Sequence, residues 1–263
     1  MSNLLSMRGV CKDYHSGVRG CSASVVALRD VDLDARAGEV TAIVAGPASG
    51  KTTLIMCAAG LMRPDRGTVS WFGGAPNRDL ASRPLGIAYA GDRPFPYAFL
   101  TARETLEYAA IVRDLPLRDN GRRVSAVLER TGLGAVADRR VDALDGGAQT
   151  RLALAAALLA EPRLLVVDDV PPGCDAASAS EAVVLLRGVA AEGGAVVVAG
   201  RFVASVSAAN VFHPTVPTRT YVLTAGRLEA PQEHLGLAQR LPGVGHARVA
   251  EVERPSPAEN EAR

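Results

Sequence analysis

Short apolar runs separated by turn residues predict strands in two parts of the chain. Residues 164–167 and 195–199 are continuous apolar runs, the pattern of parallel strands buried on both faces. Nearer the N-terminus the runs are interrupted by polar residues and bounded by glycines. The predicted strands are 25–33 and 39–44 on either side of a turn at Gly38, 68–72 before Gly73, the two buried runs, and a late hairpin at 221–223 with Gly226.

The middle of the chain has the period of helices instead. Residues 104–112 place apolar side chains at helical spacing, and 122–129 do so again before Gly132. Residues 151–160, stopped by Pro162, and 181–191 predict two further helices. A helical insertion therefore separates two sheet-containing parts. The expected fold class is α/β, with a parallel-sheet core, an N-terminal antiparallel β part and an inserted helical subdomain.

A glycine-containing turn joins a predicted strand, ending at Val44, to a helix-compatible stretch at 54–61. Small residues let successive backbone N–H groups turn toward phosphates, a lysine reaches the β- and γ-phosphates, and a hydroxyl serves Mg²⁺. Glycine is frequent where this chain has Ala45 and Ala48, so the backbone should be stiffer at both positions. The candidate nucleotide-binding residues are Ala45, Gly46, Pro47, Ala48, Ser49, Gly50, Lys51, Thr52 and Thr53, and Thr52 is also a candidate metal ligand.

The use of lysine supports this interpretation. Only Lys12 and Lys51 among the 29 basic residues are lysines. In a chain that uses arginine by default, a lysine in this turn indicates a need for a compact ammonium rather than a bulkier guanidinium. The alternative, a chance Gly-Lys-Thr turn, does not account for the flanking strand and helix.

Charge and cysteine content argue against several classes of function. The formal charge is +1 and no long basic stripe occurs, so nucleic acid is not expected as a partner. The 4 cysteines lack C-x-x-C spacing and the 4 histidines lack metal-ligand spacing, so we expect reduced thiols and no zinc site. The most apolar window, 152–160, is too short to cross a bilayer. We expect a cytoplasmic protein that reaches the membrane through a partner.

Two further segments carry candidate chemistry. The apolar run 164–167 ends in Asp168 and Asp169. Ligands bind at the carboxyl ends of strands in parallel sheets, so Asp168 is expected to hold Mg²⁺ and Asp169 to act as general base toward water. The second segment is Leu-Asp-Gly-Gly-Ala-Gln at 144–149, just before the helix predicted at 151–160.

In this order and spacing, the phosphate loop and these two segments resemble the ATP-binding cassette of ABC transporters. The resemblance covers about residues 7–230, and includes Asp175 and the Ala-Gly-Leu-Met-Arg-Pro-Asp-Arg-Gly phrase at 59–67. It implies a P-loop NTPase fold over residues 1–230, a helical subdomain at about 93–150, and a partly disordered tail at 231–263. It also implies that Mg-ATP lies between two head-to-tail cassettes, homodimeric or heterodimeric.

The resemblance assigns further site residues and partners. It implies that Tyr14 stacks on adenine, the alternative being an exposed strand aromatic. It implies that Asp145, Gly146 and Gly147 of the signature loop contact the ATP held by the partner cassette. A separate transmembrane permease subunit is expected, with the cassette peripheral on the inner face of the cell membrane. The stretch between Tyr14 and Val26 is similar to the macrolide-efflux and lipoprotein-release branch.

Departures from the family's pattern fall on groups that complete hydrolysis. Asp145 replaces the signature serine, Ala148 replaces a glutamine, and residues 171–174, Pro-Pro-Gly-Cys, replace Thr-Ser-Ala-Leu. The resemblance carries catalytic roles onto three altered positions: Asp92 in place of the glutamine, Asp169 in place of the base glutamate, and Arg201 in place of the switch histidine.

The charge of Asp145 should oppose the approach of the γ-phosphate of ATP. An ionised Asp145 about 4 Å from a γ-phosphate charge is repelled by roughly 4 kcal/mol per unit charge at an effective dielectric near 20. We therefore expect Arg201 of one cassette to pair with Asp145 of the other. Asp169 reaches less far than a glutamate, so we predict tight or moderate ATP binding and slow turnover. The alternative is that turnover is ordinary.

Three functions compete at this point. The leading hypothesis is the energy-coupling subunit of a transporter, with the permease docking near 92–100, where Phe95, Tyr97 and Phe99 line a groove or pack in the core. The second is a nucleotide-sensing regulatory pseudo-ATPase that closes on ATP without driving transport. A chromosome-maintenance or repair ATPase is disfavoured because no heptad-rich coiled coil lies between Lys51 and Leu144.

Overall fold

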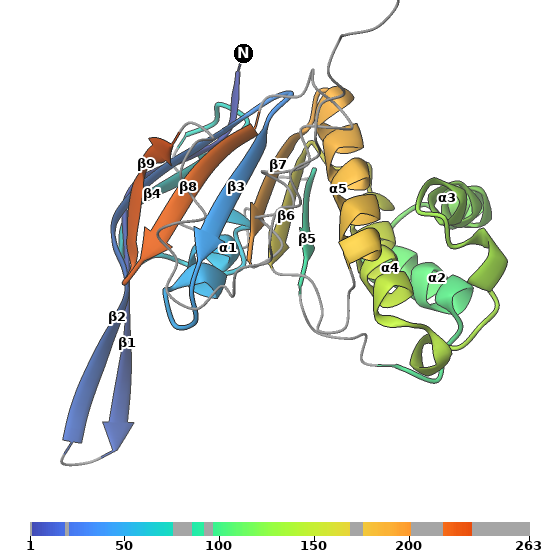
Figure 1. Cartoon of the computed structure of the whole chain (residues 1–263), viewed down its shortest axis with the longest axis horizontal. Coiled ribbons are helices and arrows are strands. Elements are labelled where there is room, and N and C mark those ends of the chain that lie inside the picture. The colour runs from blue at the N-terminus through green and yellow to red at the C-terminus, as the bar shows by residue number, and fades with distance from the viewer. Residues whose placement is uncertain are drawn as a thin grey trace, which may run out of the picture.

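The computed structural model describes residues 2–18, 21–75, 86–91, 97–168, 176–200 and 218–232. Near the N-terminus, three strands form an antiparallel sheet in the order β2-β1-β4 (Figure 1). They are β1 (Asn3–Val18), β2 (Cys21–Arg36) and β4 (Arg66–Trp71). The long β1–β2 hairpin projects beyond β4, so residues 15–18 and 21–25 lie in an extended arm.

A second sheet forms the centre of the molecule. Its strand order is β5-β6-β7-β3-β8-β9, parallel throughout except for β9, which runs antiparallel to β8. The fold class is therefore α/β, as the sequence predicts. The strands are β3 (Val40–Ala45), β5 (Ile87–Ala90), β6 (Leu164–Asp168), β7 (Ala195–Ala199), β8 (Thr218–Thr224) and β9 (Arg227–Gln232).

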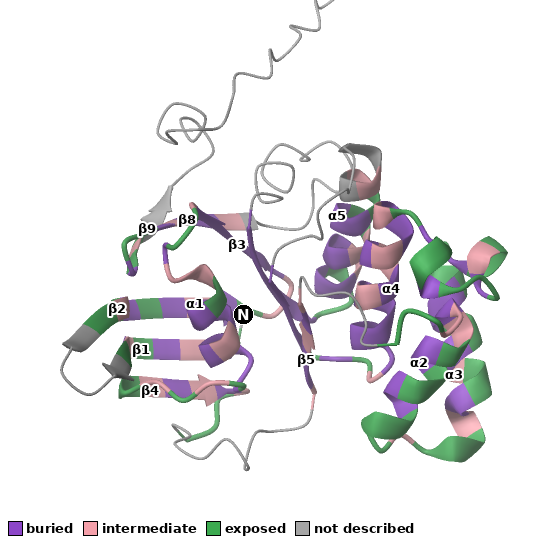
Figure 2. Cartoon of the chain, turned by 90° about the horizontal axis from the view of Figure 1, so that it is seen from below, coloured by how far each residue is buried: buried purple, intermediate pink, exposed green. Residues whose placement is uncertain are grey.

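Alternate side chains of the central strands enter two different cores. Ile43 of β3 joins a core shared with α1 (Lys51–Ala58) and the antiparallel sheet. Its neighbours Ala42 and Val44 join a core shared with α4 (Gly146–Leu158) and α5 (Ala176–Ala191). Because both faces are covered, residues 164–167 of β6 and all of β7 are apolar at consecutive positions rather than at every second one. Figure 2 shows the resulting band of buried strands through the middle of the molecule.

The helices between β5 and β6 have a core of their own. α2 (Ala102–Val112), α3 (Leu117–Arg130) and α4 pack together through Leu106, Val124 and Leu152, among others. α2 begins with a capping box, in which Thr101 accepts from the Glu104 N–H and Glu104 accepts from the Thr101 N–H. Short 3₁₀ turns at Gly134–Val136 and Val141–Ala143 lead into α4. The predicted helical insertion is present.

Several element ends differ from the sequence predictions. β1 was not predicted, because register shifts between Asn3 and Asp13 break the alternation that identifies a strand. α4 starts at Gly146, five positions before the predicted 151, since Asp145 caps it. The tail from residue 233 onward lies outside the described residues. Within the described part of the chain, no helix is long and apolar enough to span a bilayer.

Candidate functional site

The candidate phosphate-binding residues connect the carboxyl end of β3 to the first turn of α1. Gly50, the last residue before α1, has φ of 94°. A methyl group at Gly50 would overlap the carbonyl oxygen of Ala27 on the neighbouring β2. Glycine is therefore required here both by the backbone angle and by the close approach of another strand. The turn leads directly into α1, and the first N–H groups of a helix have no acceptor within the helix itself and can bind an anion.

The β8–β9 turn supports this loop from outside. The Gly226 N–H donates to the Ser49 carbonyl at 3.0 Å, and the Gly226 carbonyl accepts from the Arg29 N–H at 2.7 Å. Inside the loop, the Ser49 hydroxyl donates to the Gly46 carbonyl at 2.8 Å. The loop is thus held from outside by the β8–β9 turn, which is distant in the sequence, and from inside by the Ser49 hydroxyl.

The two alanines that replace common glycines differ in conformation. Ala48 has φ of 54°, in the left-handed region that is unfavourable for a residue with a side chain. Ala45 is the last residue of β3 and is buried, with no positive φ. Of the two positions where the sequence predicts a stiffer backbone, only Ala48 has a strained backbone angle.

Lys51 and Asp168 form an ion pair across the sheet. The Lys51 ammonium donates to the Asp168 carboxylate at 3.0 Å. Asp168 ends β6 and Lys51 follows β3, and β7 lies between these two strands. The Asp168 side chain is 2% exposed and that of Lys51 18%, so the carboxylate is buried against its counter-charge. The structure brings together the two residues that the sequence assigns to phosphate and to metal.

The donor set at this edge fits a magnesium ion bound with a nucleotide. In such sites Mg²⁺ takes one or two carboxylates together with substrate phosphates and waters, and needs no all-protein cage. No group of three or more His, Cys, Asp or Glu residues in the described ranges could hold a metal by itself. Asp168 offers one buried carboxylate, and Thr52 offers a hydroxyl in the first turn of α1.

Tyr14 reaches the same site from β1. Its hydroxyl lies 3.1 Å from the Thr53 hydroxyl in α1 and donates to the Met62 sulfur at 3.2 Å. The Tyr14 side chain remains 42% exposed, whereas Thr53 is buried. The aromatic residue is thus fixed beside the helix that follows the phosphate loop, with ring surface open to solvent.

Asp145, Gly146 and Gly147 lie on a different element, at the start of α4. The Asp145 carboxylate accepts from the Ala148 N–H at 2.7 Å, so Asp145 is the N-cap of this helix. A methyl group on Gly147 would overlap the Ser178 side chain of α5, which explains why this position is a glycine. α4 packs on α2, α3 and α5.

Comparison with known proteins decides the family. A family model described as ABC transporter matches residues 28–170, more than half of the chain. The chain belongs to the ABC transporter family. Within this family, the cassette is an ATP-binding subunit, as the phosphate loop and the two aspartates after the apolar run 164–167 predict. Members of this family bind and hydrolyse ATP.

Two curated relatives show how much of a protein the cassette represents. The macrolide export ATP-binding/permease protein MacB of Nitrosomonas europaea is 33% identical over 201 residues, which cover 74% of this chain and 30% of that protein. The cytochrome c biogenesis ATP-binding export protein CcmA of Bordetella bronchiseptica is 39% identical over 175 residues, 65% of this chain and 75% of that protein. The cassette thus spans under a third of the first relative and three quarters of the second.

Solved structures confirm the fold. The dimeric ATP-binding cassette MJ0796, in a post-hydrolysis state bound to ADP and Pi, superposes with a TM-score of 0.72 at 23% identity, covering 88% of this chain and 99% of that one. A nucleotide-free cassette from an ABC transporter gives a TM-score of 0.69 at 20% identity. At these identities the likeness concerns the fold alone.

The three candidate catalytic residues of the cassette, Asp92, Asp169 and Arg201, lie outside the described residues. The same holds for Phe95, Asp175 and the 171–174 segment. Their roles remain predictions from the sequence.

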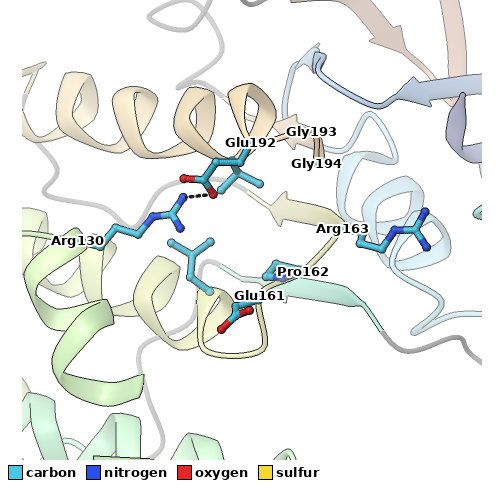
Figure 3. A pocket seen from close by; sticks show the side chains of 9 residues that line it. Arg130, Glu161, Pro162, Arg163, Glu192, Gly193 and Gly194 are labelled. Atoms are coloured by element: carbon cyan, nitrogen blue, oxygen red, sulfur yellow. Dashed lines mark hydrogen bonds and ion pairs between the residues drawn. The ribbon is translucent and has the colours of Figure 1, made fainter. Parts of the chain in front are cut away.

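A pocket of about 470 Å³ lies at the opposite edge of the sheet, by the amino ends of β6 and β7 (Figure 3). The charged side chains that line it already have partners within the cassette. These are the ion pairs Arg130–Glu192 at 2.8 Å and Arg123–Glu161 at 3.0 Å, and Arg163, which lies 4.4 Å from the centre of the Phe72 ring. The pocket lies where α3 meets the central core, and none of its lining residues belongs to the candidate nucleotide site.

Two features of the site escaped sequence reasoning. The support of the loop by Gly226 and by the Ala27 carbonyl depends on segments that are distant in the sequence, and no local pattern signals it. Asp65, whose carboxylate accepts from the Lys12 ammonium and the Asp13 N–H, lies in the 59–67 phrase that resembles the family. Its place in that phrase, two residues before Gly67, was the available signal.

Proposed function

We propose that this cassette is the energy-coupling subunit of a membrane transporter and binds Mg-ATP between two head-to-tail cassettes. The observation that carries the proposal is the Lys51–Asp168 ion pair at 3.0 Å, beside the amino end of α1. A cation for phosphate and a buried carboxylate for metal are already adjacent there. No other described part of the chain combines a glycine-containing loop, the amino end of a helix, and an ion pair with a buried carboxylate.

Each residue of the site has a distinct role in this proposal. The backbone N–H groups of Gly46 and of residues 48–51 bind the phosphates, while Pro47 has no N–H to offer, and the Lys51 ammonium moves from Asp168 to the β- and γ-phosphates. Asp168 and Thr52 hold the magnesium ion, which neutralises phosphate charge when bound. The open face of Tyr14 stacks on the adenine, beside Thr53. Asp145 to Gly147 face the nucleotide of the partner cassette.

Turnover is proposed to be slow, because the altered positions are those that act after binding. Asp169 is one methylene shorter than the usual base, while Asp92 and Arg201 replace a glutamine and a histidine. The Asp145 carboxylate at the start of α4 adds a negative charge where a γ-phosphate should approach. The same charge favours the second candidate, a regulatory pseudo-ATPase that does not drive transport.

A transmembrane permease is the proposed partner, and α2 together with the segment just before it carries a suitable docking surface. Tyr97 lies 5.9 Å from Phe99 and 5.2 Å from Tyr108 between ring centres, and both contacts are edge to face. All three side chains are at least 40% exposed, and Phe99 is 62% exposed. Of the two alternatives for Tyr97 and Phe99, a docking surface or core packing, their exposure excludes core packing. MacB, by its name, joins an ATP-binding part to a permease, which supports a permease partner at the inner face of the cell membrane.

Nucleotide titration of the full chain tests the first proposal. Wild type, Lys51→Ala and Arg118→Ala are compared for Mg-ATP binding by calorimetry and for phosphate release. Arg118 is an exposed cation on α3 and serves as the control. We expect binding in wild type and Arg118→Ala, no binding in Lys51→Ala, and little phosphate release from any of the three. Steady Lys51-dependent hydrolysis would show instead that Asp169 suffices, and unchanged binding in Lys51→Ala would refute the site.

Membrane association tests the permease partner. Phe99→Asp and Leu117→Asp make the same change at two exposed apolar residues of the helical part, 62% and 73% exposed. In the cells of origin, Phe99→Asp should reduce the fraction of cassette that sediments with membranes, and Leu117→Asp should not. Both should bind ATP like wild type. Equal membrane fractions for the two variants argue for the regulatory alternative.

A further inference from the structure

The strand that carries Tyr14 extends beyond its neighbour β4. β1 pairs with β4 as far as Cys11, which lies opposite Arg66. Its pairing with β2 continues to Val18, opposite Cys21. From Lys12 onward, the edge of β1 that continues past β4 has no described strand beside it. A strand edge of this kind has backbone N–H groups that need other partners.

Asp65, the residue just before β4, takes the place of the missing strand. Its backbone N–H donates to the Cys11 carbonyl at 2.9 Å. Its carboxylate accepts from the Lys12 ammonium at 2.8 Å and from the Asp13 N–H at 2.8 Å. The Lys12 hydrogen bond first, and then that from Asp13, lower the pKa of the Asp65 carboxyl from its ordinary value, which keeps it ionised at neutral pH.

Tyr14 is the next residue along the strand. Its hydroxyl contacts Thr53 of α1 and Met62, and Met62 belongs to the same loop as Asp65. The loop at 61–65 therefore holds β1 from Cys11 to Tyr14, first through the backbone, then through the Asp65 carboxylate, and finally through the Tyr14 hydroxyl. These contacts fix both ends of the Tyr14 side chain.

We propose that Asp65 is a positioning residue for the base of the bound nucleotide, because it fixes the backbone before Tyr14 and so sets the place of the ring. The inference rests on the proposed function, since it takes the nucleotide phosphates to be bound by residues 46–52. An aromatic surface that is already in place binds a base without first losing its own conformational freedom. Asp65 needs no contact with the nucleotide and acts through Tyr14.

Two probes separate an effect on the base from an effect on the phosphates. Mg-ATP carries both, whereas Mg-tripolyphosphate carries the phosphate chain alone. In calorimetric titrations of the full chain, Asp65→Ala should raise the Kd of ATP about fivefold or more, the equivalent of about 1 kcal/mol of base stacking. The Kd of tripolyphosphate should change by less than about twofold. Tyr14→Ala should give the same pattern, and adding Asp65→Ala to it should weaken ATP binding no further.

Asp34 provides a matched control on the same sheet. It accepts from the Ser6 hydroxyl at 2.8 Å and from the Arg8 guanidinium at 2.9 Å, a similar clamp at the other end of β1. Asp34→Ala should leave the Kd of both probes unchanged. Asp65→Asn keeps an acceptor for the Asp13 N–H but loses the charge that binds Lys12, so its Kd for ATP should lie between wild type and Asp65→Ala. It also provides the test if Asp65→Ala does not fold.

The outcomes are distinct. Equal weakening of ATP and tripolyphosphate binding in the Asp65 variants, or no weakening of either, overturns the positioning role. Lys51→Ala separates that result from a failure of the proposed function. Loss of both probes in Lys51→Ala supports the phosphate site whatever Asp65 does, and unchanged binding of both refutes it.

Discussion

The Lys51 ammonium lies 3.0 Å from the Asp168 carboxylate, although Asp168 ends β6, Lys51 follows β3, and β7 lies between these two strands. Without nucleotide, each residue is thus the counter-charge of the other. The Asp168 side chain is 2% exposed, so loss of this contact would leave a buried carboxylate without its cation. In the proposed function, nucleotide binding exchanges the pair for phosphate at Lys51 and magnesium at Asp168.

The first prediction concerns stability without nucleotide. Lys51→Ala should lower the free energy of unfolding by about 2–4 kcal/mol, because a buried carboxylate loses its cation. Lys51→Ala with Asp168→Asn should recover most of this loss, since the second change removes the unpaired charge. Urea denaturation at neutral pH measures both. If the double variant is less stable than Lys51→Ala by the full effect of Asp168→Asn alone, the pair is not coupled.

The second prediction concerns the strained alanine of the phosphate loop. Ala48→Gly should raise the free energy of unfolding by about 0.5–1 kcal/mol, because φ of 54° at Ala48 costs a residue with a side chain more than it costs glycine. Ala45→Gly is the control: it should lower stability, since it removes a buried methyl group from β3. Equal effects of the two changes in urea denaturation would contradict the strain at Ala48.

The third prediction separates the two roles of Asp145. Serine is as good an N-cap as aspartate, so Asp145→Ser should change stability by less than about 0.5 kcal/mol, whereas Asp145→Ala should cost about 1 kcal/mol. In the closed dimer the charge matters instead. Arg201→His should weaken ATP-dependent dimerisation, measured by sedimentation, and adding Asp145→Ser should restore it.

This double-mutant cycle has a definite negative result. If Arg201→His and Asp145→Ser have independent, additive effects on dimerisation, the two residues do not pair across the interface. Asp145→Asn is the matched control, because it keeps the size of the side chain and an acceptor for the Ala148 N–H while removing the charge. It should restore dimerisation as serine does.

The fourth prediction concerns the buried thiol of α1. Burial raises the pKa of Cys57 from 9.0 to about 12. Between these values the folded chain holds a proton that the unfolded chain releases, so stability should fall as the pH rises above 9.0. A variant with serine at Cys11, Cys21 and Cys174 isolates this thiol. At about pH 8, iodoacetamide should label it in guanidinium chloride but not in the folded protein.

Prompt labelling of folded Cys57 would mean that α1 opens readily, which conflicts with its buried environment. The α1 helix also receives a hydrogen bond from Trp71, whose indole N–H donates to the Ala58 carbonyl at 2.8 Å. Trp71 is the only tryptophan of the chain, so its fluorescence reports whether the end of α1 has opened in the same sample.

Much of the fold could be predicted because its signals are local. The buried strands β6 and β7 are continuous apolar runs, and the capping box at Thr101 marks the start of α2 in the sequence itself. β1 could not be found in this way. Its register shifts interrupt the alternation, and only pairing with β2 and β4 makes it a strand.

By itself, the sequence determined which residues form the candidate site: a glycine-containing turn with Lys51 and Thr52, and Asp168 at the end of an apolar run. These residues carry their chemistry in their own functional groups. The tertiary structure decided how they are held. It brought Lys51 into an ion pair with Asp168 and the Ala27 carbonyl close to Gly50. It also placed Asp65 within hydrogen-bonding distance of β1, the strand that carries Tyr14. Those contacts join segments that are far apart in the chain, and their geometry follows from packing the two sheets on α1, which no local pattern encodes.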